Sequence, residues 1–407
     1  MKLKKYKLGE ICNIIAGGDA PQNTTKDKTS ANLIPVYSNG MDNEGLYGYT
    51  DKARITSPSY TISARGTIGV SFLRKTPYVP IVRLLSVIPK KEGISLEYLY
   101  YYSKLFEFKR DGSVQQQLTV PMLSEIIVNL PSFLIQKKIA TVLSSLDEKI
   151  VLNKKMNQKL EAMAKHLYDY WFVQFDFPDK KGKPYKSSGG KMAWNEQLKR
   201  VIPEGWEVKP ISEMLKCDIP GDWGEEEKKG NYNYKVNCVR GCDMIDMTNL
   251  PMRFILQSNS KKLLQTDDFI IEISGGSPTQ STGRIVQVTD EIINRFNKKV
   301  ICSNFCHGIR ISEKEYISYF SQMWNMFYAN KVFFNFEGKT SGLKNFQFDT
   351  FIDNKWYFPP ECLAKEYNYL IRKIQSQIDK NDSENKKLIL LRDRLLPLLM
   401  NGQVEVG

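Results

Sequence analysis

Two short cysteine-containing segments are the first places where residue type and spacing could do chemistry. Cys238 and Cys242 are separated by three residues, and Cys302 and Cys306 repeat that spacing with His307 directly afterwards. Zinc ribbons usually separate paired cysteines by two residues, and cysteine beside a strand is commonly a small buried hydrophobic side chain. We therefore predict that this chain binds no metal.

Other motifs that would indicate catalysis or nucleotide binding are incomplete. Gly338–Gly342 contains Gly-Lys-Thr but lacks the upstream glycine of a phosphate-binding P-loop. Phe358-Pro359-Pro360-Glu361 does not match the Asn/Asp-Pro-Pro-Tyr/Phe motif of adenine methylation, and no acidic–lysine nuclease signature is present. His166 falls beside a predicted helix seam, where it is a packing or surface residue rather than a base. We therefore expect no catalytic residue and no cofactor bound by this chain.

Polar loops that contain glycine suggest a different chemistry, the binding of DNA. Glycine lets the backbone approach a ligand closely, and Arg, Gln, Asn and Lys can hydrogen-bond to base edges or phosphates. Ordinary turns are the alternative interpretation of these loops. The DNA-binding candidates are Ser38, Asn39, Gly40, Arg65, Gly66, Gln115, Gln116 and Gln117 in the first half, and Gly275, Gly276, Lys339, Thr340, Ser341, Lys344 and Asn345 in the second.

The charge of the chain agrees with an anionic partner. The 407 residues carry a net charge of +13, and the basic excess lies in residues 1–202, whereas residues 203–360 are nearly neutral. A basic balance favours nucleic acid, although a generally lysine-rich composition would give the same total. The basic start has no uninterrupted apolar core of a signal peptide, and no run of 18 apolar residues could span a membrane. We expect a cytoplasmic protein with reduced thiols and no membrane contact.

The candidate loops lie between short predicted strands. Alternating apolar residues and turn signals such as Asn39-Gly40 and Gly45 divide each half of the chain into such strands. A helix is expected over 95–108 with Ser95 as its N-cap, and another over 312–329. The strands are expected at 33–37, 59–63, 68–73 and 81–88, and at 269–273, 283–288 and 306–311.

A helical segment that occurs twice organises the whole chain. Residues 131–175 match residues 359–402 at a constant offset of 228, so that Pro131 aligns with Pro359 and Leu167 with Leu395. A gapless match of this length indicates a duplication. Residues 6–8 and 206–208 also align, which indicates that the preceding globular regions are diverged copies.

Each repeated segment carries a coiled-coil seam. Apolar residues from Ile139 to Trp171, and from Tyr367 to Leu399, recur at alternating steps of four and three residues. Helices that pack only on their own domains are the alternative. Two asparagine layers interrupt each seam, and a buried asparagine fixes register at a cost in stability. These register residues are Asn153, Asn157, Asn381 and Asn385; antiparallel pairing would place Asn153 opposite Asn385, while parallel pairing would also match asparagine with asparagine.

The predicted fold is therefore α+β, with two globular domains that are each followed by a long helix. The expected order is a first globular domain (1–130), a spacer helix (131–175), a linker (176–202), a second globular domain (203–358) and a second spacer helix (359–402). The linker assignment depends on the content of Pro, Gly, Ser and Lys after residue 175.

This layout resembles the specificity (S) subunit of type I restriction-modification systems over essentially the whole chain. The resemblance implies two target recognition domains and an antiparallel helix pair that separates them and docks two methyltransferase (modification) subunits. Restriction/translocase subunits would complete the complex, and S-adenosylmethionine, ATP and Mg would bind only to the partners. The motifs are Leu130-Pro131, Gln136, Ile139, Leu146-Asp147 and Ile150, then 167–172 (LYDYWF) and 175–178 (FDFP), and finally 202–208 (IPEGWEV).

The resemblance leads us to expect recognition of a bipartite asymmetric site on double-stranded DNA, with adenine methylation and cleavage carried out by partner subunits. Tyr170, Trp171 and Phe172 are expected to bind the methyltransferase because aromatic residues at a helix end are common interface anchors; capping of the helical core is the alternative. The competing hypotheses are a recognition component of a methylation-only or phage-defence system, a stand-alone nuclease and a coiled-coil scaffold.

Overall fold

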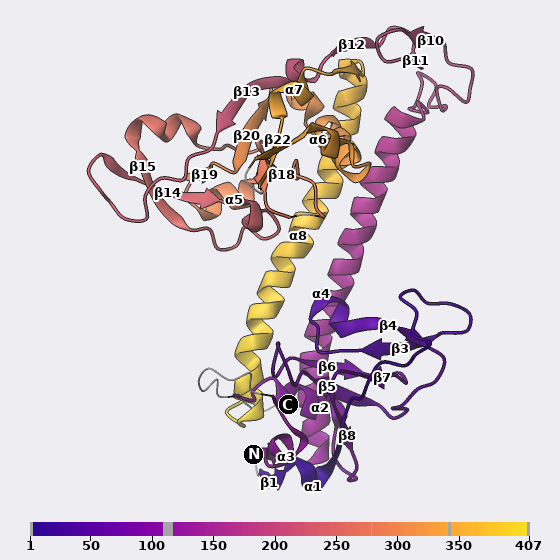
Figure 1. Ribbon diagram of the computed structural model, residues 1–407, viewed down its shortest axis with the longest axis vertical. Coiled ribbons are helices and arrows are strands. Elements are labelled where there is room, and N and C mark those ends of the chain that lie inside the picture. Colours follow the sequence, from indigo (N-terminus) through magenta and orange to yellow (C-terminus); the bar gives the residue numbers. More distant parts are fainter. Residues whose placement is uncertain (1–2, 109–116, 278, 341–342, 405–407) are drawn as a thin grey trace. The chain divides into compact units, whose positions relative to one another are not determined.

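The computed structural model describes residues 3–108, 117–277, 279–340 and 343–404, which fall into two compact units (Figure 1). The first unit comprises residues 1–156 and 380–407, and the second comprises residues 157–379. Two long helices, α4 (Phe133–Tyr168) and α8 (Glu361–Met400), each contribute one part to each unit. Each unit therefore combines a β-rich domain with one part of each long helix.

The first unit contains a four-stranded sheet, β2-β8-β5-β6, and a three-stranded sheet, β4-β3-β7. Side chains of the larger sheet, of helix α2, of α4 and of the end of α8 form one apolar core. The strands are β1 (Lys4–Lys7), β2 (Cys12–Ala16), β3 (Ile34–Tyr37), β4 (Leu46–Thr50), β5 (Ser59–Ile62), β6 (Ser71–Arg74), β7 (Val79–Pro80), β8 (Leu85–Pro89) and β9 (Ile127–Leu130). The short helices are α1 (Leu8–Ile11), α2 (Leu96–Ser103) and α3 (Val120–Ser124).

Local sequence signals account for much of this unit. Ser95 caps α2, where its side chain accepts a hydrogen bond from Tyr98 N, although the helix ends at Ser103 rather than at residue 108. The single strand predicted over 81–88 was wrong, because Val82 and Arg83 adopt left-handed backbone conformations with φ of 50° and 60°. These two residues separate β7 from β8.

The second unit repeats the strand order of the first. Its four-stranded sheet is β13-β20-β16-β18, and its three-stranded sheet, β15-β14-β19, has the same single parallel pairing as β4-β3-β7. The two domains are therefore copies of one topology. The strands are β12 (Glu207–Pro210), β13 (Leu215–Pro220), β14 (Tyr232–Val239), β15 (Met252–Leu256), β16 (Phe269–Glu272), β17 (Ser274–Gly275), β18 (Ile285–Gln287), β19 (Val300–Cys302), β20 (Cys306–Ile311), β21 (Glu337–Thr340), β22 (Leu343–Phe346) and β23 (Lys355–Phe358), and the short helices are α5 (Asp290–Arg295), α6 (Ile317–Ala329) and α7 (Phe348–Ile352).

The segment that we expected to be a linker is folded onto the second unit. It forms the hairpin of β10 (Met192–Asn195) and β11 (Arg200–Pro203). Phe177 stacks on Tyr185 at a centroid distance of 4.6 Å and on Trp206 at 5.4 Å. These aromatic contacts anchor a segment whose composition alone suggested flexibility.

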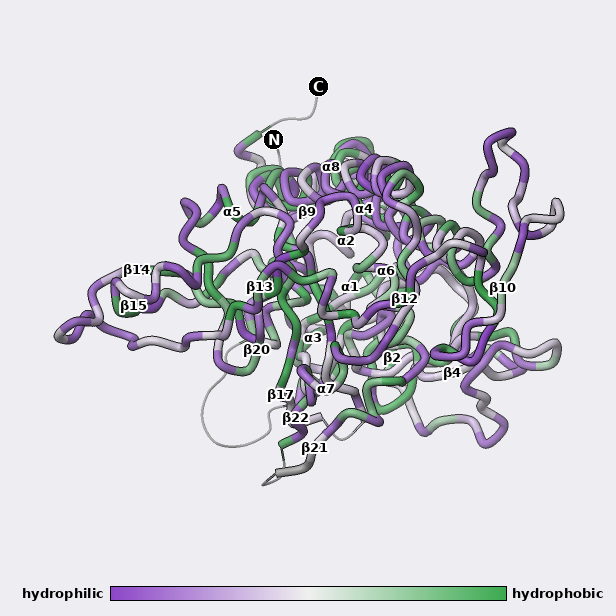
Figure 2. Tube along the Cα trace, turned by 90° about the horizontal axis from the view of Figure 1, so that it is seen from above, coloured by the Kyte–Doolittle hydropathy of each residue, from purple (hydrophilic) through white to green (hydrophobic). Residues whose placement is uncertain are grey.

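The long helices pair in the antiparallel direction. In the first unit Arg392 Nη1 donates to Asp147 Oδ1 at 2.7 Å, and Asn153 Nδ2 donates to Asn385 Oδ1 at 3.0 Å. Asp147 precedes Asn153 in α4, whereas its partner Arg392 follows Asn385 in α8, so the two helices run in opposite directions. All the residues assigned to the two seams are buried or half-buried. Figure 2 shows hydrophilic and hydrophobic colours alternating along α4 and α8, as expected for helices that bury one face.

Asn153 is completely buried, and its Oδ1 has no hydrogen-bond partner. A buried unsatisfied oxygen destabilises a fold, so we expect Asn153→Leu combined with Asn385→Leu to raise the free energy of unfolding by about 1 kcal/mol. Thermal unfolding of the double variant measures the change, and Lys155→Leu on the exposed side of α4 is the control. A lower unfolding temperature than the wild type would contradict the prediction.

The aromatic end of α4 is part of the core of the second unit. A π-helical turn, Asp169–Val173, leaves Trp171 5% exposed and Phe172 fully buried. The Phe172 ring lies 4.9 Å from the rings of both Tyr319 and Tyr367. The rings of Trp171 and Phe172 thus bury their apolar area within the unit, as in the alternative of core capping, and methyltransferase binding by the end of α4 stays a prediction. Tyr170 remains 39% exposed.

None of the helices in the described part of the chain is both long enough and apolar enough to cross a membrane.

Candidate nucleic-acid interface

Asn39 joins the predicted DNA-binding loops of the first unit. Its Nδ2 donates to Val82 O at 2.6 Å, and its Oδ1 accepts from Ala64 N at 2.8 Å. Its backbone oxygen also accepts a hydrogen bond from Thr67 Oγ1 at 2.7 Å. One side chain after β3 therefore holds the β5–β6 loop and the β7–β8 turn together.

Arg65, Arg83 and Gln117 meet at the same edge. Gln117 Oε1 accepts from Arg65 Nε at 3.1 Å, from Arg65 Nη2 at 2.7 Å and from Arg83 Nη1 at 3.5 Å. The backbone of the next residue, Leu118, donates to Ala64 O and fixes Gln117 beside the loop. Both arginines are exposed, and no described carboxylate lies within ion-pair distance of either one. This edge presents uncompensated positive charge that can contact an anion or an acceptor edge.

The structure brings together the predicted residues Asn39, Arg65 and Gln117 and adds Arg83. Ser38 lies at the same loop, where its backbone N–H donates to Gly45 O, and Gly66 adopts a left-handed φ of 68° with open space around it. Gly40 lies 3.6 Å from Gly45, measured from an ideal Cβ position. Gln115 and Gln116 lie outside the described residues. Arg83 was missed because it was assigned to the interior of a strand.

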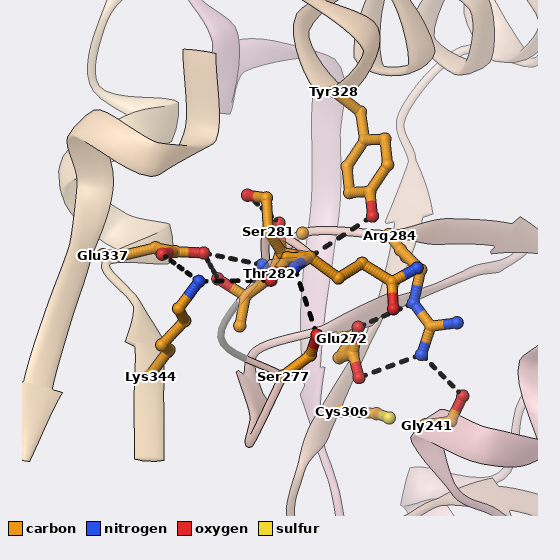
Figure 3. Close-up of polar contacts among 12 residues, drawn as sticks. Gly241, Glu272, Ser277, Ser281, Thr282, Arg284, Cys306, Tyr328, Glu337 and Lys344 are labelled. Carbon is orange, nitrogen blue, oxygen red and sulfur yellow. Dashed lines mark hydrogen bonds and ion pairs between the residues drawn. The ribbon is translucent and has the colours of Figure 1, made fainter. Parts of the chain in front are cut away.

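In the second unit the predicted loops meet through the hairpin of β21 and β22 (Figure 3). Gly275 of β17 pairs with Lys344, and Ser274 pairs with Asn345. Lys344 Nζ lies 3.3 Å from Glu337 Oε2, and only 14% of its side chain is exposed. Lys344 therefore stabilises the hairpin, and its charge is compensated.

Glu337 also accepts hydrogen bonds from Thr282 N at 2.7 Å and from Thr282 Oγ1 at 3.0 Å. Burial by itself raises the pKa of Glu337, but the Thr282 hydrogen bonds and Lys344 outweigh burial and hold that pKa below its usual value. The stabilising effect of the ionised group is present above the usual pKa and is lost as the pH falls through the depressed value. Neutral pH therefore keeps this connection charged and intact.

A second ion pair, with Glu272, neutralises the neighbouring Arg284. Arg284 donates from Nε to Glu272 Oε2 at 2.8 Å and from Nη2 to Glu272 Oε1 at 3.0 Å, and Nη2 also reaches Gly241 O (Figure 3). Hydrogen bonding to Glu272 raises the pKa of Arg284. Arg240 pairs in the same way with Asp243, at 2.8 Å for each of two hydrogen bonds. Arginines at this edge are thus neutralised by carboxylates, unlike Arg65 and Arg83.

Gly276 is the remaining predicted residue of the β17 loop whose surroundings are described; it is exposed, with Leu343 3.8 Å from an ideal Cβ position. Lys339 and Thr340 belong to β21, opposite Lys344 and Leu343. Ser341 lies outside the described residues.

The cysteine segments do not assemble a metal site in the described part of the chain. Cys238, Cys302 and Cys306 are buried among apolar residues, whereas Cys242 is exposed. Burial raises the pKa of Cys306 to about 12, so its thiol is protonated at neutral pH. Protonated, enclosed thiols act as small hydrophobic side chains.

Comparison with known proteins shows which family this chain resembles. The family model for the type I restriction modification DNA specificity domain matches residues 2–162. The C-terminus of a putative type I specificity subunit from Mycoplasma pneumoniae, S.MpnORF289P, is 37% identical over 124 residues, which cover 30% of this chain and 84% of that protein. The chain belongs to the family of type I specificity subunits.

Two further proteins are similar to this specificity subunit over nearly the whole of the given sequence. The type I restriction enzyme MjaIX specificity subunit of Methanocaldococcus jannaschii is 28% identical over 409 residues, which cover 96% of this chain and 88% of that protein. The crystal structure of an S subunit from M. genitalium superposes with a TM-score of 0.59 at 15% identity, over 98% of this chain and 96% of that chain. The shared fold confirms the predicted class of two α+β domains with long antiparallel helices.

Proposed function

We propose that this specificity subunit recognises a bipartite, asymmetric site on double-stranded DNA, one half with each β-rich domain. The observation that carries the proposal is the repeated strand order of the two domains with different chemistry on equivalent loops. Two copies of one topology supply two recognition modules. Loops with different side chains recognise two different half-sites, because base edges are distinguished by the side chains that contact them.

The charge distribution indicates that the two domains contribute unequally to DNA affinity. Arg65 and Arg83 are exposed and lack a described carboxylate partner, whereas Arg284 and Lys344 are paired with Glu272 and Glu337. Counterion release scales with the number of phosphates that a protein neutralises. The first domain therefore contributes more of the salt-dependent DNA affinity.

The chain acts without chemistry of its own. Adenine methylation and cleavage are performed by two methyltransferase subunits and by restriction/translocase subunits, which bind S-adenosylmethionine, ATP and Mg. The absence of methyltransferase and nuclease motifs from the sequence supports this assignment, as do relatives named as specificity subunits. The complex works in the cytoplasm, where its DNA substrate is located.

Methylome sequencing of the host, with and without the gene for this chain, tests the proposal. We expect a methylated motif with two specified parts and an unspecified gap, which disappears when the gene is deleted. A continuous palindromic motif, or no change in methylation, contradicts the proposal. Metal-dependent DNA cleavage by the purified chain would indicate a stand-alone nuclease instead.

A further inference from the structure

Two exposed arginines of the first unit, Arg65 and Arg83, are arranged to bind one acceptor edge. Arg65 and Arg83 come from loops 18 residues apart in sequence, yet both donate to Gln117 Oε1. A carboxamide oxygen is a neutral acceptor, so a ligand can replace it at lower cost than it could replace a carboxylate. Gln117 therefore keeps the guanidinium groups in place without neutralising them.

The backbone that presents Arg83 is strained. Val82 and Arg83 both have positive φ, a conformation that is a genuine outlier for a β-branched residue such as valine. Val82 N donates to Gly18 O at 2.8 Å, and Val82 O accepts from Asn39 Nδ2 at 2.6 Å. Such strain persists only where the surroundings determine it, and it is concentrated at binding sites.

A third arginine adds to the positive charge at this edge. Arg54 is exposed, and its Nη1 lies 2.8 Å from the position that a Cβ would occupy on Gly18. Gly18 is also the residue that holds the Val82 backbone. A glycine here leaves room for the Arg54 guanidinium beside the Val82–Arg83 turn.

We propose that Arg65 and Arg83 form a guanine-recognition fork, which specifies a G·C base pair in the half-site of the first domain. This inference rests on the proposed function, because it assumes that the first domain contacts DNA. Guanine offers O6 and N7 as adjacent acceptors in the major groove, and arginine is their commonest bidentate donor. Gln117 Oε1 occupies the place of such an acceptor, and Gln117 is thus a positioning residue. The equivalent loops of the second domain lack this capacity because Arg284 is already held by Glu272.

The test uses the full-length chain purified with the subunits that it assembles with, and duplexes that carry the methylome-defined target. Each guanine of the first half-site is replaced in turn by 7-deazaguanine, which lacks the N7 acceptor. We expect one replacement to weaken binding by the wild type about tenfold or more. The double variant Arg65→Met with Arg83→Met removes both guanidinium donors, so it should bind that duplex and the unmodified duplex equally. Arg394→Met, at an exposed arginine of α8, should be as sensitive to the replacement as the wild type.

Gln117→Glu probes the positioning residue. A carboxylate would bind both guanidinium groups as an ion pair, so the affinity for the target should fall about tenfold while the thermal unfolding temperature does not fall. A first half-site without guanine, or a double Met variant that remains sensitive to 7-deazaguanine, overturns the inference and leaves the proposed function standing. A wild-type complex without any sequence preference overturns both.

Discussion

A chain in which residues 1–130 are replaced by the matching domain of a relative will direct methylation to a target that has changed in one half only. The pairing of β1 with β9 brings the two ends of this domain together, with Tyr6 opposite Val128. The replaced segment therefore begins and ends at one place. We expect the second half-site and the length of the gap to stay unchanged.

The junction with α4 depends on backbone groups of the exchanged domain. Gln136 is 2% exposed; its Oε1 accepts from Ser95 N at 2.9 Å, and its Nε2 donates to Gly93 O at 3.3 Å. An incoming domain with the same backbone satisfies this side chain regardless of its own residues. Methylome sequencing of a strain that carries the hybrid gives the result, and the converse replacement of residues 203–358 is the control. A hybrid that alters both half-sites would refute the assignment of one domain to each half.

Trp171→Ala will destabilise the second unit by about 3–5 kcal/mol, the usual cost of truncating a buried large aromatic side chain. Trp171 is 5% exposed, and its ring lies 5.7 Å from that of Tyr367. Chemical denaturation of the full chain measures the loss. Weaker co-purification of this variant with a methyltransferase would then report unfolding rather than a lost contact.

Tyr170→Ala separates the two effects, because Tyr170 is 39% exposed and adjacent in sequence. We expect its unfolding free energy to stay within about 0.5 kcal/mol of the wild type, as for most surface substitutions. If the end of α4 docks a methyltransferase, this variant loses the partner while remaining folded. A Trp171→Ala protein as stable as the wild type would show that the ring is not part of the core.

The long helices and some of the strands were predictable because their patterns repeat. The seam from Ile139 to Trp171 extends over many turns, and β20 was predicted with its observed bounds, Cys306–Ile311. Periodicity is a strong signal when one face of an element is buried and the other is not. The asparagine layers matched in either orientation, so the antiparallel direction was expected from the family resemblance and not from the periodicity.

The parts that could not be predicted depend on contacts between distant residues or on ambiguous side chains. No glycine or asparagine marks the left-handed turn at Val82 and Arg83, so the apolar run there was taken as one strand. Arg284 and Glu272 are 12 residues apart, and nothing local indicates that they pair. Trp171 illustrates a third limit, because large aromatic residues are favoured both in cores and at interfaces.

The paired ends of the two β-rich domains have a consequence for inheritance. Lys4 lies opposite Leu130 at one pair of ends, and Glu207 lies opposite Phe358 at the other. A genetic crossover that falls outside these strand pairs transfers a whole domain together with both strands that close it. The long helices are left intact. Recombination between related genes can therefore give a host a new DNA target in a single event. The hybrid protein does not first need further mutations to restore its folding.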